Sequence, residues 1–428
     1  MERPNKNLTK VAFAGVVGTT IEWYDFFVAG VAAATIWPSI FFPSNNPSTA
    51  VLISISSFAL GFATRPIGAL IFGHYGDRVG RKNMLIWTLI LMGGGTLGLG
   101  LVPPYSSIGV YAGILITLLR LIQGLGVGGE WGGVSVWLAE HSHSSRWRAF
   151  WTSWVNQGVP LGLLMSSGLF TLFQVMFPRD FSTVGWRILF YIGGAVIIIG
   201  IFIRLRLEES PLFKSNKQIE KFPFSSLIKN KPKTLALMIG VFLFVNGVGY
   251  IVITFSQAYL KALGVSPVIS TLSQLIASSI AVFVLIGGAL LGDKIGRKKV
   301  LIVASVILVI FTYPYFIMLN TGNTLLIILA QAILWSLDMF GYSVIAAFFS
   351  EQFPTKFRYS GSGFSFHVSA ALSGGLLPVI GSYLLLIFGG PSSAWPYIGG
   401  VVILYCLTSL ISVVLARETI MEELSNIH

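Results

Sequence analysis

Four acidic side chains stand inside long apolar segments, where an ionised group is costly. Glu22 and Asp25 lie three residues apart, Glu130 lies within GVGGEWGG, and Asp338 lies within LWSLDMFGY. A charge at the centre of a bilayer costs about 2.5–3.5 kcal/mol on insertion scales, so such groups face a cavity or a partner. Carboxylates in this setting can take up and release protons. We predict Asp25 as the proton site, Glu22 as its modulator, and Glu130 and Asp338 as further protonation sites.

Two arginines, Arg65 and Arg120, are the basic residues within these apolar segments. At a helical rise of about 1.5 Å per residue, Arg120 lies level with Glu22 and Asp25. A carboxylate facing Arg120 can hold or release a proton according to whether the pair is intact, which adds Arg120 to the predicted coupling residues. A guanidinium fork also binds a carboxylate through two hydrogen bonds. Two interpretations stay open: the arginines bind a substrate carboxylate, or they only neutralise the buried acids as structural pairs.

Further polar and aromatic side chains occur at a similar predicted depth and could line a substrate cavity. Asn246 and Tyr250 are four residues apart and therefore share one helix face. His367 could exchange protons near neutral pH, although a satisfied core histidine is the more common case. Packing is the competing interpretation for each single aromatic, and a hydrogen bond between helices is the competing one for Glu130. The predicted substrate-binding set is Arg65, Arg120, Trp23, Tyr24, Gln123, Gln157, Asn246, Tyr250, Asp338, Tyr342 and His367.

Positioning these residues requires elements that cross a membrane, and the composition indicates them. The chain has 428 residues, of which 54% are hydrophobic and 10% are charged, whereas about a quarter of the residues of soluble proteins are charged. A membrane span needs roughly 20 apolar residues. Segments of this kind predict an all-α polytopic membrane protein with twelve transmembrane helices, at 11–37, 50–76, 83–103, 108–138, 149–177, 184–207, 234–260, 267–292, 299–320, 323–350, 360–388 and 394–416.

The distribution of basic residues predicts the orientation of these helices. Most of the 28 Lys and Arg residues fall in segments that are cytoplasmic if the N-terminus lies inside, as the positive-inside rule requires. We expect a multi-pass protein of the cell (cytoplasmic) membrane with both termini in the cytoplasm. The longest cytoplasmic segment follows the sixth span. It divides the chain into an N-terminal six-helix half (1–207), a linker (208–233) and a C-terminal six-helix half (234–428).

Two repeated segments place charged residues at the cytoplasmic ends of the helices. GHYGDRVGRK at 73–82 returns, weakened, as ALLGDKIGRK at 289–298, and WLAEHSHSSRWR at 137–148 is echoed by FSEQFPTKFR at 349–358. The repeats indicate two related halves. Their charges could form ionic latches that break when the cytoplasmic side opens, or they could only set the topology. The predicted cytoplasmic gate consists of Asp77, Arg78, Arg81, Glu140, Asp293, Arg297, Glu351 and Arg358.

The first repeat meets the pattern G-x-x-x-D-R-x-G-R-[RK] in full and resembles the loop signature of the major facilitator superfamily. GTTIEWYDF at 18–26, RLIQGLGVGGEWGG at 120–133 and EQFPTKFRYSG at 351–361 are similar to motifs of its metabolite:proton symporter family, as is RPIGALIFGHYGDRVGRK at 65–82. That family carries small organic acids and zwitterions. The resemblance implies two pseudo-symmetric six-helix halves and transport by alternating access. In related sugar porters an aspartate of the first helix pairs with an arginine of the fourth, positions that Asp25 and Arg120 match by motif.

Rival function classes lack their sequence features. The histidines offer no metal-binding or catalytic cluster, a channel would want pore-lining rings from several subunits, and no GxxxxGK[ST] loop indicates an ATP-driven pump. We therefore predict a proton-coupled symporter that imports a small organic acid, is not an enzyme, and uses no cofactor or metal. Its partners are the substrate, protons and the lipid bilayer, with no nucleic acid, and it is expected to be a monomer. Symport or uniport of a zwitterionic osmolyte or a neutral sugar remains the alternative.

Overall fold

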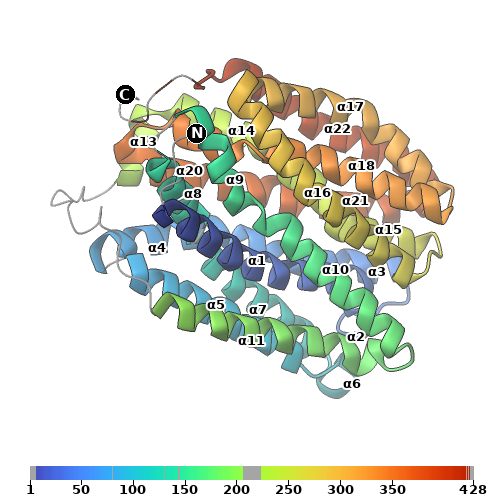
Figure 1. Cartoon of the computed structure of the whole chain (residues 1–428). Helices are drawn as coiled ribbons and strands as arrows, with labels where there is room; N and C mark the ends of the chain where they lie inside the picture. Colours follow the sequence, from blue (N-terminus) through green and yellow to red (C-terminus); the bar gives the residue numbers. More distant parts are fainter. Residues whose placement is uncertain are drawn as a thin grey trace.

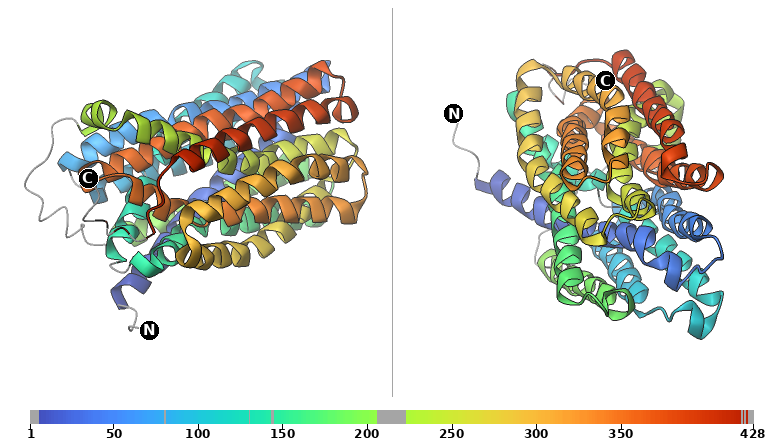
Figure 2. Two further views of the ribbon diagram at one scale, coloured as in Figure 1. Left: turned by 90° about the horizontal axis from the view of Figure 1, so that it is seen from above. Right: turned by 90° about the vertical axis from the view of Figure 1, so that its right-hand side faces the viewer.

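Long helices dominate the structure and lie side by side in one bundle (Figure 1). The computed structural model describes residues 6–79, 81–129, 131–142, 145–205, 223–420, 422 and 424, and this part of the chain contains no strand. The beginning of α1 and the segment that follows α22 lie at the same end of the bundle (Figures 1 and 2). We call this end, which also holds the end of α8 and the start of α17, the predicted cytoplasmic end.

Each predicted span corresponds to a helix or to a pair of consecutive helices. Ten segments of the described chain are long and apolar enough to cross a membrane, and α1 and α5 supply the other two predicted crossings. The first six crossings are α1 (Lys6–Thr35), α3 with α4 (Pro47–Ala63, Arg65–Val79), α5 (Arg81–Leu101), α7 with α8 (Tyr111–Gly128, Trp131–His141), α9 with α10 (Arg148–Asn156, Gly158–Met176) and α11 (Trp186–Leu205). The fold class predicted from the sequence is confirmed.

The remaining six crossings follow a short helix, α13 (Pro223–Asn230). They are α14 with α15 (Pro232–Tyr250, Ser256–Ala262), α16 (Pro267–Ile295), α17 (Arg297–Asn320), α18 with α19 (Thr324–Tyr342, Ile345–Gln352), α20 with α21 (Thr355–Ala370, Leu376–Ile387) and α22 (Pro391–Leu415). Short helices α2 (Trp37–Ile40) and α6 (Tyr105–Ile108) lie at the other end of the bundle. Residues 206–222, which include the first part of the predicted linker, lie outside the described residues, so the linker at 208–233 stays a prediction.

Local chemistry explains where several helices begin and change geometry. The Asn46 side chain accepts the backbone N–H of Ser48 at the start of α3, and Asn323 does the same for Leu325 and Leu326 at the start of α18. Wider π-helical turns interrupt two crossings, at Ile251–Phe255 and at Ala371–Gly375. Such turns occur often at functional sites. The first follows Tyr250 directly, and the second lies four residues after His367, so both adjoin predicted site residues.

The first six crossings contact the last six along several helix pairs. α10 packs along α16, α3 packs against α21, and α20 packs against α4 and α8. The view along the bundle shows the blue and green helices on one side and the yellow to red helices on the other (Figure 2). Hydrogen bonds join the two sets, including Gln157 Nε2 to the Val282 carbonyl at 2.8 Å and the Thr171 hydroxyl to Thr271 at 2.8 Å. The buried polar residues described below lie between or beside these contacting helices.

Glycines in α7 explain how its arginine comes close to α3 and α4. A β-carbon at Gly124 would collide with the carbonyl group of Gly61, and one at Gly128 would collide with the carbonyl group of Arg65. The absence of side chains lets the helix backbones approach each other closely, as small residues do at membrane helix interfaces. The motif GLGVGG therefore positions Arg120, one turn before Gly124, against the neighbouring helices.

We expect Gly128→Val to lower the free energy of unfolding by roughly 1–3 kcal/mol, because the valine side chain must push α4 away from α7. Thermal unfolding of the purified protein in detergent measures the effect. Gly94→Val is the matched control, since a β-carbon at Gly94 on α5 meets no atom within 4 Å. Equal melting temperatures for the two variants would contradict the close-packing role of Gly128.

Candidate functional site

Two fully buried arginines contact the same aromatic ring. The guanidinium carbon of Arg65 is 4.0 Å from the centre of the Phe26 ring, and that of Arg120 is 4.2 Å from the same centre. Phe62 adds a second contact to Arg65 at 4.2 Å, and Phe58 adds one to Arg120 at 4.5 Å. These cation–π contacts stabilise the positive charges of both guanidiniums. A cation–π contact supplies no hydrogen-bond acceptor, so the N–H groups of the two arginines still need acceptors.

Most of the N–H groups of the two arginines have no acceptor at good geometry among the described residues. There, none of the three nitrogens of Arg65 donates a hydrogen bond of good geometry, and neither do Nε and Nη2 of Arg120. Tyr250 is the side chain nearest to providing one for Arg65. Arg65 interacts electrostatically with Glu22 and Tyr250, and Arg120 with Asp25. A buried charge that lacks hydrogen bonds is expensive unless a ligand supplies them. The pair is therefore suited to an anion with several acceptor oxygens.

Asp25 and Arg120 are joined through Gln123 and form no direct ion pair. Arg120 Nη1 donates to Gln123 Oε1 at 2.6 Å, and Gln123 Nε2 donates to Asp25 Oδ2 at 3.0 Å. The same amide nitrogen donates to the Thr96 hydroxyl oxygen at 2.9 Å. The sequence placed Asp25 and Arg120 at one depth, but it did not indicate that a glutamine stands between them.

A small cavity lies beside the arginines and between the two sets of helices. Trp23, Phe27 and Val159 line it from the first set, and Asp338, Asn246 and Trp335 are among the residues that line it from the second. Trp23 and Tyr250, which line the cavity, also contact or interact with Arg65. Of the predicted substrate-binding residues, those that line this cavity are Trp23, Asn246, Tyr250, Asp338 and Tyr342.

Asp338 is fully buried, and neither of its carboxyl oxygens has a hydrogen-bond partner among the described residues. No ion pair joins Asp338 to the described part of the first six crossings. The indole of Trp335, one turn earlier on α18, lines the same cavity. Its place one turn from Asp338 is a sequence signal that our prediction missed.

The other predicted substrate residues lie outside the cavity. The Tyr24 hydroxyl donates to the Leu189 carbonyl at 2.8 Å, and Gln157 bonds across to α16 as described above. Both hydrogen bonds join neighbouring helices, which fits a packing role for Tyr24 and Gln157. His367 is buried on α20 and interacts with Arg65 and with the backbone of Gly128. It therefore belongs to the surroundings of the arginines.

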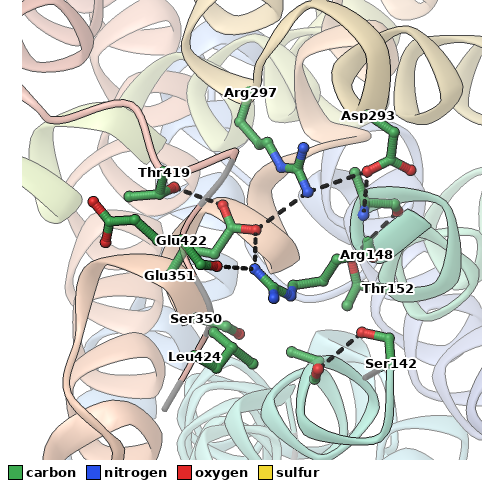
Figure 3. Close-up of polar contacts among 12 residues, drawn as sticks. Ser142, Arg148, Thr152, Asp293, Arg297, Ser350, Glu351, Thr419, Glu422 and Leu424 are labelled. Carbon is green, nitrogen blue, oxygen red and sulfur yellow. Dashed lines mark hydrogen bonds and ion pairs between the residues drawn. The ribbon is translucent and has the colours of Figure 1, made fainter. Parts of the chain in front are cut away.

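A buried ionic network closes the predicted cytoplasmic end (Figure 3). Glu351 Oε1 accepts from Arg148 Nη1 at 2.7 Å and lies 3.2 Å from Arg297 Nη2. Thr419, after α22, donates its hydroxyl to Glu351 Oε2 at 2.6 Å. Because Arg148 belongs to α9 and Glu351 to α19, the network joins the first six crossings to the last six.

Asp293 extends this network to the start of α9. Its two carboxylate oxygens accept the backbone N–H groups of Ala149 and Phe150 at 2.9 and 2.8 Å, and Oδ1 lies 3.1 Å from Arg297. A carboxylate at a helix N-terminus satisfies free N–H groups and complements the helix dipole. The aspartate of the second loop repeat thus holds the inner end of a helix from the first half.

Glu140 forms a second ion pair across the same end, with Arg358 at 3.1 Å. Among the other predicted gate residues, the side chains of Asp77, Arg78 and Arg81 lie outside the described residues, as does all of Glu130. Arg148 and Thr419 were missing from the predicted gate. Arg148 is the last residue of WLAEHSHSSRWR, as Arg358 is the last residue of FSEQFPTKFR. The alignment of the two segments could therefore have indicated Arg148 as a gate residue. No group of three possible metal ligands occurs in the residues that the structure describes.

Comparisons with known proteins agree with this architecture. The model of the Major Facilitator Superfamily matches residues 17–377. An inner membrane metabolite transport protein, YhjE, of Escherichia coli is 35% identical over 90% of both chains. The shikimate transporter of the same organism is 31% identical, with 96% of this chain and 94% of the relative covered.

Other relatives and solved structures extend the comparison. The proline/betaine transporter of Salmonella typhimurium is 31% identical over 88% of this chain and 78% of its own length. A partially occluded inward-open structure of the E. coli xylose transporter superposes with a TM-score of 0.72 at 17% identity, covering 98% of this chain and all of that one. At that identity the structural likeness shows the fold alone.

Proposed function

We propose that this chain, which belongs to the Major Facilitator Superfamily, is a proton-coupled symporter that imports a small organic acid by alternating access. Members of this family are transporters and not enzymes. We further propose that it works as a monomer in the cell membrane with both termini in the cytoplasm. The two six-helix halves would move against each other around the cavity.

The N–H groups of Arg65 and Arg120 that lack acceptors are the observation that supports a substrate with a carboxylate. Both guanidiniums are fully buried, and together they leave five nitrogens without a hydrogen bond of good geometry to any residue that the structure describes. A carboxylate offers about four lone-pair sites and can accept two parallel bonds from one guanidinium. The relatives are consistent with this class, because shikimate, proline and betaine each carry a carboxylate.

Asp25 is the proposed proton site. It is 1% exposed, accepts a hydrogen bond from Gln123 at Oδ2, and interacts with Thr96 and electrostatically with Arg120. Protonation would remove the negative charge that the arginine faces, and an anionic substrate would supply a new one. Proton and substrate binding would thus favour each other, as symport requires.

A zwitterionic substrate is the second candidate, and Asp338 favours it. This carboxylate has no hydrogen-bond partner among the described residues, and the Trp335 indole lies in the same cavity wall. A carboxylate beside an aromatic face can bind an ammonium or a quaternary ammonium group. A substrate with a carboxylate at the arginines and a cationic nitrogen at Asp338 would use both ends of the site.

A thermal-shift screen of the purified protein, followed by uptake into proteoliposomes, tests the substrate class. The screen compares shikimate and other organic acids with proline, glycine betaine and xylose. We expect stabilisation by carboxylates and none by xylose. Stabilisation confined to proline and betaine would replace the organic acid with the zwitterion, and stabilisation by xylose alone would overturn the carboxylate assignment.

We expect Arg65→Gln to weaken the affinity for the best organic acid about 10- to 150-fold, because a charge-assisted hydrogen bond contributes about 1.5–3 kcal/mol. Substrate titration by intrinsic fluorescence in detergent measures it. Arg187→Gln is the matched control, since Arg187 already has an acceptor in the Gly100 carbonyl. Affinities equal to the control's would contradict a substrate role for Arg65.

A further inference from the structure

We infer that the side-chain amide of Gln123 is the switch that couples the proton at Asp25 to the availability of Arg120. While Asp25 is ionised, Gln123 accepts from Arg120. Once Asp25 is protonated, the amide turns round, accepts from Asp25 and releases Arg120. Gln123 acts here as a positioning residue, and not as the substrate ligand predicted from the sequence. This inference rests on the proposed function and adds the residue through which coupling passes.

Four hydrogen bonds fix the amide in its present orientation. Oε1 accepts from Arg120, while Nε2 donates to both Asp25 and Thr96. Thr96 donates its own hydroxyl hydrogen to the Met92 carbonyl at 2.8 Å, so its oxygen is an acceptor for Gln123. In the reversed orientation the NH₂ group would face the guanidinium and the oxygen would face the carboxylate. An ionised Asp25 therefore permits one orientation only.

Protonation of Asp25 at Oδ2 reverses this preference. The new O–H is a donor that faces Gln123 Nε2, which is also a donor, so the contact loses its hydrogen bond. Rotation of the amide by about 180° places Oε1 against the Asp25 hydroxyl and Nε2 against Arg120. The Thr96 hydroxyl can either donate or accept, so it remains bonded in both orientations. The proton stays on Asp25, and no covalent bond changes apart from that O–H.

The rotation changes what Arg120 can bind. In the present orientation Nη1 is committed to Gln123, and only Nε and Nη2 lack partners. After rotation the amide NH₂ faces the guanidinium, so Nη1 loses its acceptor and all of its N–H groups need one. An anionic substrate supplies that acceptor. By linkage, the substrate then holds the amide in the rotated orientation and raises the affinity of Asp25 for the proton.

Few other charged or titratable groups bear on this switch. Arg120 from α7 and Tyr24 from α1 interact with Asp25, and Arg65 from α4 interacts with Arg120. Glu22 lies one turn before Asp25 on α1, and it interacts with Arg65. Tyr250 from α14 interacts with both arginines, and His367 from α20 interacts with Arg65. The neighbours contributed by α5 and α11, Thr96 and Gly193, carry no charge.

An infrared difference spectrum, acid minus neutral, tests the switch without any substrate. For the purified protein in lipid we expect a protonated-carboxyl band that Asp25→Asn removes. We also expect a glutamine amide carbonyl band, since Oε1 exchanges a guanidinium donor for a carboxyl donor. That band should be absent from both Asp25→Asn and Gln123→Leu. A carboxyl band without the amide band would overturn the switch and leave Asp25 as the proton site, whereas absence of the carboxyl band would overturn both proposals.

The pH dependence of substrate binding provides the second test, with shikimate as the probe. We expect the wild-type affinity to rise at least about fivefold between pH 7.5 and pH 5.5, a typical coupling between two sites, and Gln123→Leu to vary less than about twofold. Gln331→Leu is the matched control, because Gln331 is equally buried and its partners are Ser256 and Tyr315, both in the last six crossings. Gln123→Asn provides a second, smaller change should the leucine variant fail to fold. Retention of the wild-type pH profile by a folded Gln123 variant would overturn the inference.

Discussion

Replacement of Asp25 by asparagine should abolish accumulation of substrate driven by a pH gradient, while exchange of substrate across the membrane continues. Asparagine keeps the shape of the side chain and an acceptor for Gln123, but it cannot bind a proton. The transporter can then cycle only with substrate bound on both sides. We expect uphill uptake to fall by about 5- to 150-fold, since the coupling free energy between two sites is typically 1–3 kcal/mol. Radiolabelled uptake and counterflow in proteoliposomes measure the two activities.

The matched control for this substitution is Asp180→Asn, which makes the same change at an exposed residue between α10 and α11. It should accumulate substrate as the wild type does. Unchanged uphill uptake in Asp25→Asn would show that the coupling proton binds elsewhere. Loss of exchange together with accumulation would mean that Asp25 is needed for folding or for substrate binding.

Replacement of Glu351 by glutamine should open the predicted cytoplasmic end. Glu351 pairs with Arg148 and Arg297 and accepts from Thr419, and its side chain is fully buried. Removing one partner of a buried ion pair costs about 3–5 kcal/mol, because it leaves an uncompensated charge. In the proposed alternating-access cycle these pairs form in the closed state and break in the open state, so the cost falls on the closed state. The population of open molecules should rise by at least about 100-fold.

The rate of maleimide labelling at a buried reporter measures this opening. Ser142→Cys places a thiol within the gate (Figure 3), in a background where Cys406, the chain's one cysteine, is replaced by serine. Glu422→Gln is the control, since Glu422 forms a half-exposed pair with Arg417 at 3.7 Å. We expect faster labelling in Glu351→Gln than in the control. Equal rates in two folded variants would contradict a latch role for Glu351.

The spans and the depth of the charged residues could be predicted from the sequence, because apolar length and helical rise decide both. In the structure Gln123 links Asp25 and Arg120 by hydrogen bonds. Spacing gives depth along the membrane and not the rotation of one helix against another. The Gln123 bridge and the contact of both guanidiniums with the Phe26 ring depend on that rotation, and so they required the structure.

The partners of the gate residues also could not be predicted from the sequence. The loop repeat predicted that Asp293 lies at an inner helix end, but the N–H groups that it caps lie 144 residues earlier in the chain. Arg148 stands in a basic segment whose charges are explained by topology alone. Its pairing with Glu351 became visible only when α9 was placed against α19. Long-range partners of this kind are set by how the two halves meet, which one sequence does not specify.

The most direct measurement of coupled transport is proton movement driven by the substrate alone. Proteoliposomes containing the protein and a trapped pH-sensitive dye are prepared with equal pH on both sides, and the organic acid that best stabilises the protein is added outside. Symport predicts that the lumen becomes acidic as substrate enters, and that Asp25→Asn gives no acidification. Substrate entry with no change in luminal pH would contradict proton-coupled symport.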